Sequence, residues 1–405
     1  MSPIIDFGKV ALAGAFIKPE QFASEVRYPL RLYFCNDCLA VQVVDKVSPG
    51  ILFKNYFYFS SAIRTLREHF IDFATEVSSR FLDPENSTVI EFGCNDGVLL
   101  RPLADQKIRT VIGVDPATNI VRAIDDPRIT VVNDFFDEEV ARRLIAEHGK
   151  ADMVVANNVY AHIPDMQGVT RAIRNVLKDD GVFIFEVHYL GKIINELQYD
   201  MIYHEHLYYH SLLSLTNHLD RHDMLVFDVK PVQIHAGSMR YYACKKGSLH
   251  AASVSPQVAA LRKEELANGY DRAETYARFA ADVAERKEKL MNLLARLKAR
   301  GSSIAGYGAS GRANTMIQYC GIDQRYLDYM IDDAPAKLGL YTPGSHFLIQ
   351  PRSILDRAPR PDYLLLLAWS FFGEIAKKCS NYLDGGGRMI VPLPNVQIMM
   401  HPGRE

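Results

Sequence analysis

The sequence predicts an α/β protein in which two parallel-sheet domains follow a small N-terminal domain. Between residues 61 and 254, short apolar runs alternate with longer polar stretches that suit helices, a pattern typical of βαβ units. The alternation begins again after residue 300, behind a long amphipathic stretch. A length of 405 residues leaves room for two or three domains. We therefore expect domains over residues 1–60, 61–254 and 255–405.

The composition excludes several classes of function. Hydrophobic residues make up 48% and charged residues 23%, an ordinary globular mixture. The net charge of −2 provides no basic field for a nucleic acid or an anionic membrane. No apolar run approaches the roughly 20 residues of a membrane span, and the N-terminus lacks a secretory pattern. Six cysteines are too few for a disulfide scaffold, so we expect a cytoplasmic protein. Its oligomeric state stays open.

The expected elements follow in order along the chain. Residues 1–60 are expected to be irregular, with short apolar runs. The first sheet is expected to contain Thr88–Phe92, Thr110–Val114, Ile129–Val132, Met153–Ala156, Val182–Val187, Leu225–Val229 and Met239–Ala243. Because only a short connection joins the last two strands, they should finish the sheet antiparallel. A seven-stranded sheet with this ending is typical of methyltransferases.

The C-terminal part is expected to begin with a long helix and end in a Rossmann-like domain. Over residues 255–300, apolar side chains recur on one helical face, which indicates a linking helix packed on a domain rather than a partner-binding coil. The apolar positions are Phe279, Val283, Leu290, Leu294 and Leu297. The strands expected after it are Ser303–Tyr307, Leu327–Ile331, Tyr363–Trp369 and Met389–Val391.

A glycine loop follows the first strand of the larger sheet. Gly93 and Gly97 allow a ligand to approach the backbone closely, and a helix expected from Val98 presents unpaired N–H groups. Asp115 ends the next apolar run, 22 residues after Gly93, where its carboxylate can accept hydrogen bonds from two ribose hydroxyls.

This loop resembles the S-adenosylmethionine loop of class I methyltransferases. A dinucleotide fingerprint would require glycine at 95 and 98, whereas the chain has Glu91 at the head and Asn95 between the two glycines. Asp134 and Phe135 follow the third strand and are expected at the adenine. Asn157 follows the fourth and is expected at the methionine end. A structural turn of another α/β fold is the alternative.

A histidine-rich segment follows the fifth strand. Tyr203, Glu205 and His206 form a cluster that can supply a general base near neutral pH. His206 and His210 have i, i+4 spacing, but the chain lacks the His-Glu-x-x-His pattern of a zinc site. His162 follows the fourth strand, and His235 precedes the last one; each of these two is as well explained by structure as by function.

A second glycine loop opens the C-terminal domain. Gly306, Gly308 and Gly311 form a Gly-x-Gly-x-x-Gly pattern between a strand and a helix, which suits a phosphate or pyrophosphate. Arg312 would add a charged donor, and Asp332 could meet a sugar hydroxyl. The loop on its own suggests NAD; beside an S-adenosylmethionine site, a nucleoside-diphosphate substrate is the more economical ligand. A plain structural turn is the alternative.

With these segments, the chain resembles the three-domain sugar C-methyltransferases, which methylate a keto-deoxysugar carried on a nucleoside diphosphate. It is most similar to the C-3′-methyltransferases of dTDP-linked deoxysugars. The resemblance covers nearly the whole length. It is carried by Tyr28–Leu30, Phe34-Cys35, Tyr56–Ser61, Glu91–Gly97, His162–Pro164, Tyr189–Gly191, Tyr203–His206, Gly237, Arg240-Tyr241, Gly306–Gly308 and Cys320–Ile322.

The resemblance implies roles for individual residues. His206 matches the family's general base, with Tyr203, Glu205 and His162 as its supporting groups. The nucleotide sugar is expected to meet a further set of residues, part of it on the C-terminal domain. This set is Tyr56, Tyr58, His188, His235, Gly237, Arg240, Gly306, Gly308 and Arg312.

The chain also departs from the family. The family holds zinc through two Cys-x-x-Cys pairs, and only the second pair, Cys35 and Cys38, is present; the first would lie before Ile5. Because a tetrahedral structural site needs four ligands, zinc binding stays uncertain. His188 stands where the family has an acidic residue. The nucleotide, the sugar and the methylated carbon therefore stay open.

The implied reaction passes through an enolate. His206 would remove the proton next to the ketone, Glu205 would orient its ring, and Tyr203 or His162 would donate to the enolate oxygen. Three alternatives remain. They are O-methylation of a sugar hydroxyl, an NAD-dependent oxidoreductase or epimerase using the second glycine loop, and a non-catalytic protein that binds a sugar nucleotide or S-adenosylmethionine.

Overall fold

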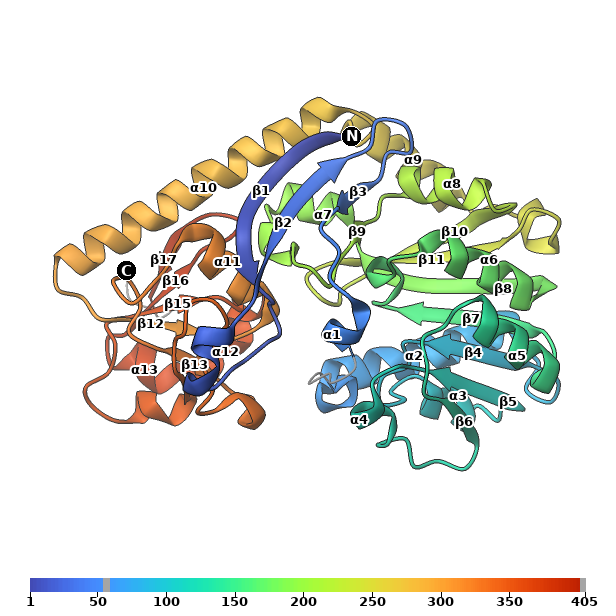
Figure 1. Ribbon diagram of the computed structural model, residues 1–405, viewed down its shortest axis with the longest axis horizontal. Helices are drawn as coiled ribbons and strands as arrows, with labels where there is room; N and C mark the ends of the chain where they lie inside the picture. The colour runs from blue at the N-terminus through green and yellow to red at the C-terminus, as the bar shows by residue number, and fades with distance from the viewer. Residues whose placement is uncertain (54–58, 401–405) are drawn as a thin grey trace.

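Three β-sheets organise the computed structural model, which describes residues 1–53 and 59–400. In Figure 1 the C-terminal domain lies on one side, the larger seven-stranded sheet on the other, and β1 and β2 between them. No helix within the described ranges is long and apolar enough to cross a membrane.

The N-terminal segment forms an antiparallel sheet, so the prediction that residues 1–60 are irregular is wrong. The sheet has the order β1-β2-β3-β9 and consists of β1 (Ser2–Ala11), β2 (Arg27–Phe34), β3 (Val41–Val43) and β9 (Tyr208–Tyr209). Ile5 and Phe7 alternate with exposed residues along β1, as expected for a strand with one buried face. Short helices η1 (Pro19–Ser24), α1 (Pro49–Phe53) and η2 (Ser60–Ala62) follow.

The middle of the chain forms the predicted seven-stranded sheet, in the order β10-β11-β8-β7-β4-β5-β6. Its strands are β4 (Thr88–Phe92), β5 (Thr110–Val114), β6 (Ile129–Val132), β7 (Ala151–Asn157), β8 (Leu177–His188), β10 (Met224–Val232) and β11 (Ser238–Lys245). The first five are parallel, and β11 pairs antiparallel with both β8 and β10, which confirms the predicted ending. Apolar clusters cover both faces of the sheet.

Helices and short turns connect these strands and place loops at their carboxyl ends. The helices are α2 (Arg64–Phe81), α3 (Leu100–Asp105), α4 (Thr118–Val121), α5 (Glu138–His148), α6 (Met166–Val176), α7 (Leu190–Asn195) and α8 (Leu212–Asp220). The 3-10 turns are η3 (Tyr160–His162), η4 (Tyr199–Met201) and η5 (Leu249–Ala252). Ligands of parallel sheets bind at this edge, so the loops there are the candidates for a site.

The C-terminal domain contains a six-stranded sheet with the order β14-β13-β12-β15-β16-β17. The strands are β12 (Ile304–Tyr307), β13 (Met330–Asp332), β14 (Ile349–Pro351), β15 (Tyr363–Leu366), β16 (Arg388–Val391) and β17 (Gln397–Met399). Its helices and turns are α11 (Gly311–Cys320), η6 (Pro335–Lys337), η7 (Arg352–Asp356), η8 (Trp369–Phe371), α12 (Phe372–Lys378) and α13 (Ser380–Asp384). β14 and β17, each three residues long, were not predicted.

The segment over 255–300 forms two helices, α9 (Pro256–Ala267) and α10 (Ala273–Ala299), instead of one. Gly269, at φ +72°, lies in the turn that separates them. The predicted apolar face of α10 is buried. It packs in one continuous hydrophobic core with the N-terminal sheet and the C-terminal domain, so these two parts support each other beneath α10 (Figure 1).

Candidate active site

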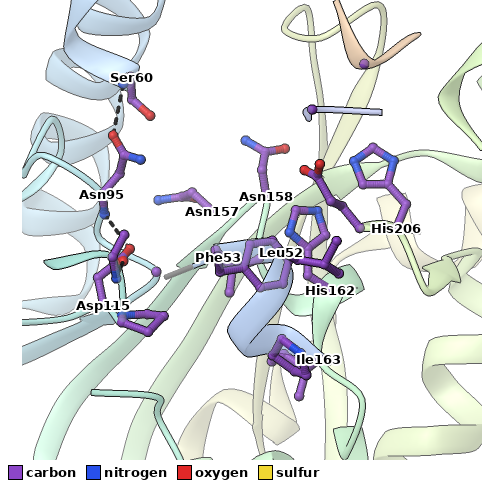
Figure 2. Close-up of a pocket in the computed structure, with 18 of the residues that line it drawn as sticks. Leu52, Phe53, Ser60, Asn95, Asp115, Asn157, Asn158, His162, Ile163 and His206 are labelled. Carbon is purple, nitrogen blue, oxygen red and sulfur yellow. Dashed lines mark hydrogen bonds between the residues drawn. The ribbon is translucent and has the colours of Figure 1, made fainter. Parts of the chain in front are cut away.

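A large cleft, with a volume of about 2290 Å³, lies where the three sheets meet. Its walls come from the loops after β4, β5, β7 and β8, the histidine-rich segment, the loop after β1 and the start of α11. Figure 2 shows Asn95 and Asp115 on one side, His162 and His206 on the other, and Asn157 and Asn158 between them. The predicted site residues in this lining are Glu91, Gly93, Asn95, Asp115, Phe135, Asn157, His162, His188, Tyr203, Glu205, His206, His235 and Arg312.

The first glycine loop wraps tightly around the end of β4. Gly93 and Gly97 have φ values of +66° and +77°, and Asn95 lies at +50°. The Asn95 N–H donates to Asp115 Oδ2 at 3.0 Å, and the Ser60 N–H donates to Asn95 Oδ1 at 2.9 Å (Figure 2). The segment before α2 thus closes over the loop through a contact that the sequence analysis missed.

The two glycines shape the loop for reasons other than those predicted. A Cβ at Gly93 would overlap the Val159 side chain, so the glycine makes room for a neighbouring turn rather than for the cofactor. Gly97 does not line the cleft, and a Cβ there would lie 3.3 Å from Ile124 Cγ1. Positive φ is the stronger reason for glycine at both positions.

Two buried carboxyl groups, Asp115 and Glu91, lie at this loop. Asp115 accepts from the N–H groups of Asn95 and Ala117 at 3.0 and 2.8 Å, while burial raises its pKa. Burial also raises the pKa of Glu91 well above its usual value, and the nearby Asp115 adds to the effect. Glu91 Oε1 accepts from Asn157 Nδ2 at 3.2 Å.

The side chains of Asp115, Glu91 and Asn157 together fit S-adenosylmethionine. Within the part of the chain that the structure describes, Glu91 Oε2 and Asn157 Oδ1 are buried acceptors without a hydrogen-bond partner. The cofactor carries a sulfonium, an ammonium and ribose hydroxyls, which supply positive charge and donors to such acceptors. Phe135 also lines the cleft, but Asp134 does not: it is exposed and lies 3.7 Å from Arg143. The prediction that Asp134 contacts the cofactor therefore needs correction.

His206, the predicted general base, has a ring that is held in one orientation. Its Nδ1 lies 2.9 Å from the Met201 carbonyl oxygen, which can only accept a hydrogen bond. This contact assigns the proton to Nδ1 and leaves the Nε2 lone pair to accept a proton. Burial, with the nearby His162, holds the pKa of His206 well below its usual value, so the ring is neutral at pH 7. The Met201 carbonyl thus fixes the orientation of the ring, and the predicted orienting role of Glu205, which lines the same cleft, stays a prediction.

Aromatic and imidazole rings surround this base. The Tyr203 ring centroid lies 4.1 Å from that of His206, and burial raises the Tyr203 pKa well above its usual value, so its hydroxyl stays protonated. The His162 ring lies 4.9 Å from His206 and stacks on Phe53 of α1 at 5.8 Å. Burial lowers the pKa of His162 to about 4. Both groups are neutral hydrogen-bond donors near the base.

Two further histidines extend the cluster. The His188 ring centroid lies 5.2 Å from that of His206 and 5.7 Å from that of His235. Burial lowers the pKa of His235 to about 4. Among the described residues, nothing hydrogen-bonds to the buried Nε2 of His188. These neutral rings can contact sugar hydroxyls without adding charge to the cleft.

Arg240 and Gly237 are structural in this fold, contrary to the prediction that they contact substrate. Arg240 is 2% exposed; its Nε lies 2.7 Å from Glu186 Oε1, and its Nη1 lies 3.1 Å from Glu76 Oε2. Gly237 has φ +108° in the turn before β11, where a Cβ would lie 2.8 Å from Lys192 Cγ. Neither residue lines the cleft.

The second glycine loop is closed by a carboxylate of its own domain. The Ala309 N–H donates to Asp332 Oδ2 at 2.7 Å, and the Gly308 N–H donates to the Ile331 carbonyl at 2.8 Å. These donors are the ones that would hold a phosphate. Gly306 and Gly308 lie against Met330 and Ala368 and do not line the cleft, which corrects their expected role as substrate contacts.

His69 of α2 is a cleft residue that the sequence analysis missed. Its Nε2 lies 3.0 and 2.9 Å from the two carboxylate oxygens of Glu186, which is fully buried in β8. The sequence did contain a sign of such a residue, because a carboxylate such as Glu186 inside an apolar strand needs a buried partner. Tyr56 and Tyr58, the two predicted substrate-side tyrosines, lie outside the described residues.

Cys35 and Cys38 lie together in the turn after β2, but they do not make a complete zinc site. Hydrogen bonds from the Cys38 and Asp37 backbone lower the Cys35 pKa against the opposing effect of burial. Over residues 1–53 and 59–400, no group of three potential metal ligands occurs. The residues described therefore do not fit the four-ligand structural zinc that the family resemblance implies.

We expect the purified chain to hold less than one zinc per molecule, because two thiolates supply half of a tetrahedral site. Elemental analysis of the wild type checks this, with Cys35→Ser as the matched variant. Stoichiometric zinc that disappears in Cys35→Ser would contradict the expectation and point to further ligands.

Comparisons with known proteins agree with this arrangement. Three families match consecutive segments: "Putative zinc binding domain" at residues 1–53, "Methyltransferase domain" at 64–226, and "C-methyltransferase C-terminal domain" at 233–394. The C-methyltransferase NovU of Streptomyces niveus is 31% identical over 398 residues, which cover 98% of this chain and 94% of that protein. A ubiquinone biosynthesis O-methyltransferase of Methylobacterium sp. (strain 4-46) is 33% identical over 97 residues, 24% of this chain and 39% of that protein.

Solved structures match less than half of the chain, and more distantly. An S-adenosylmethionine-dependent methyltransferase from Clostridium acetobutylicum is 15% identical, covers 44% of this chain and 92% of its own, and has a TM-score of 0.33. The magnesium protoporphyrin IX methyltransferase of Synechocystis PCC 6803, with bound S-adenosylmethionine, is 14% identical and has a TM-score of 0.32. The match covers 45% of this chain and 78% of that protein's chain.

Proposed function

The chain belongs to the S-adenosylmethionine-dependent C-methyltransferase family, and on this premise we propose that it methylates a carbon next to the ketone of a nucleoside-diphosphate-linked keto-deoxysugar. The observation that carries the proposal is the neutral His206, which faces the same cleft as the cofactor loop and has Nε2 ready to accept a proton. Proximity within one cleft is worth several kcal/mol to a reaction of two substrates.

The size of the cleft supports a large second substrate. Ligand pockets typically hold about 300–1,000 Å³, and this cleft is about 2290 Å³. Beyond the cofactor loop it reaches the loop after β1, the start of α11 and Lys337 of the C-terminal domain. A sugar nucleotide is long enough to use both regions, with its sugar at the histidine cluster.

In the proposed reaction, His206 removes a proton, and Tyr203 and His162 donate hydrogen bonds. His206 Nε2 takes the proton next to the ketone, and the electrons of that C–H bond move to the carbonyl oxygen as an enolate. The protonated Tyr203 hydroxyl and the neutral His162 ring are the donors available to that oxygen. The enolate carbon would then form a bond to the methyl group that bound S-adenosylmethionine would supply, and S-adenosylhomocysteine would leave as the S–C bond breaks. The His206 imidazolium afterwards returns its proton to water.

The mass and isotope content of the product test the proposed function. Incubation with S-adenosylmethionine and a keto-sugar nucleotide should add one methylene to the mass of the sugar nucleotide, whereas an epimerase would leave the mass unchanged. Loss of deuterium from the carbon beside the ketone should accompany C-methylation and not O-methylation. A thermal-shift screen with S-adenosylhomocysteine present selects the sugar nucleotide, because a ligand that binds the native state raises its stability.

The pH dependence should reflect the buried base. Because burial lowers the pKa of His206, kcat/KM should stay constant as pH falls through about 6.5, the ordinary histidine value, and decline only below it. His162 and His235, with pKa values of about 4, add no charge in that range. Rates from about pH 5 to 8 check this, and an acid limb at 6.5 or above would contradict the neutral, buried base.

A further inference from the structure

Asp200 forms a buried connection between the catalytic segment and the C-terminal domain. It lies on η4 and is 0% exposed. Arg312 of α11 reaches it with Nε at 3.0 Å and Nη2 at 3.2 Å, and Trp369 of η8 donates from Nε1 at 2.9 Å. Both partners belong to the C-terminal domain. We call these three residues the Asp200 clamp.

The clamp is one residue away from the group that holds the base. Met201 follows Asp200 in the three-residue turn η4. The Met201 carbonyl accepts from His206 Nδ1 at 2.9 Å and from the Tyr209 hydroxyl at 3.3 Å. In so short a turn, a shift of the Asp200 backbone must also move the Met201 carbonyl.

Arg312 is held in place by its contacts within the clamp. Its guanidinium stacks over the Trp369 ring at 5.0 Å from the centroid, and its side chain is 16% exposed. The remaining Nη1 lies 3.4 Å from the Ser370 hydroxyl. Asp200 balances the charge of Arg312, and because Arg312 also lines the cleft, its contact with a substrate phosphate stays a prediction.

We propose that Arg312 and Trp369 are positioning residues for the base: by anchoring Asp200, they hold the Met201 carbonyl where it keeps His206 in the Nδ1–H tautomer with Nε2 toward the cleft. The inference rests on the proposed role of His206. It assigns a catalytic task to the C-terminal domain, whose own glycine loop is occupied by Asp332. Asp200 and the adjacent Met201 thus connect the C-terminal domain to the ring nitrogen of His206 that carries the proton.

The test measures the tautomer directly. In protein labelled with ¹⁵N-histidine, the His206 resonances, assigned by their absence in His206→Asn, should show a protonated Nδ1 and an unprotonated Nε2. In Asp200→Asn, which preserves shape but removes the ion pair, the two nitrogen shifts should move toward each other. We expect kcat to fall by about 10²-fold with KM for S-adenosylmethionine unchanged. Arg312→Lys is a milder change, because it retains the charge but loses the pair of parallel guanidinium donors. Its His206 nitrogen shifts and its kcat should lie between those of the wild type and those of Asp200→Asn.

A matched control breaks a different contact with the C-terminal domain. Glu25 accepts from the Gly344 N–H at 2.8 Å and lies 3.0 Å from His346 Nε2, and it does not touch η4. Glu25→Gln should leave the His206 shifts and kcat as in the wild type. Unchanged His206 shifts in both clamp variants would overturn the proposal. Proton exchange that persists in His206→Asn would instead overturn the base assignment, while the nitrogen shifts would still report on the clamp.

Discussion

Replacing His206 with asparagine should lower methyl transfer by about 10²–10⁴-fold, the usual contribution of a general base. The asparagine amide can still donate to the Met201 carbonyl in place of Nδ1, so the local fold should survive. Solvent exchange of the proton beside the ketone should be lost together with methyl transfer. Binding of S-adenosylmethionine and sugar nucleotide should change little, because the lost interaction acts in the transition state.

His204 provides the matched control in the same segment. It is 2% exposed, its Nε2 lies 3.0 Å from the Pro29 carbonyl oxygen, and it does not line the cleft. His204→Asn should therefore keep the wild-type kcat even if the thermal midpoint falls. Exchange at the wild-type rate in His206→Asn would show that another group removes the proton, and Tyr203 or His162 would be tested next.

Replacing Asp115 with alanine should weaken S-adenosylmethionine binding by about 10²-fold or more, because hydrogen bonds to a carboxylate contribute roughly 1.5–3 kcal/mol each. The side chain is expected to accept from the ribose hydroxyls. It also accepts from the Asn95 and Ala117 N–H groups, so its loss would loosen the glycine loop as well. Calorimetric titration with S-adenosylmethionine measures the effect.

Asp134 is the matched control for Asp115. Both carboxylates follow strands of the same sheet, but Asp134 is exposed and outside the cleft. Asp134→Ala should leave the affinity for S-adenosylmethionine unchanged. An unchanged affinity in Asp115→Ala would show that the carboxylate at 115 does not hold the cofactor, and a loss in Asp134→Ala would show that Asp134 also contributes.

The strands of the central sheet and its antiparallel ending could be predicted because the information for them is local. Five apolar runs and the stretches between them follow the period of strand and helix, and parallel crossovers allow few arrangements. The N-terminal sheet could not be predicted in this way. β1 pairs with β2 across an intervening loop of 15 residues, from Leu12 to Val26, and β3 pairs with β9, more than 160 residues away. Pairing at such separations depends on what the rest of the fold brings nearby.

The positions of the first glycine loop and of His206 in the cleft were likewise predictable, because glycine turns and a histidine after a parallel strand have local signatures. The partners of buried charged side chains have no such local signature in the sequence. Asp332 accepts from the second glycine loop, Arg240 pairs with Glu186, and Arg312 pairs with Asp200. A buried charge must be paired, yet the residue that pairs it comes from wherever the packed elements meet, so these assignments required the three-dimensional fold.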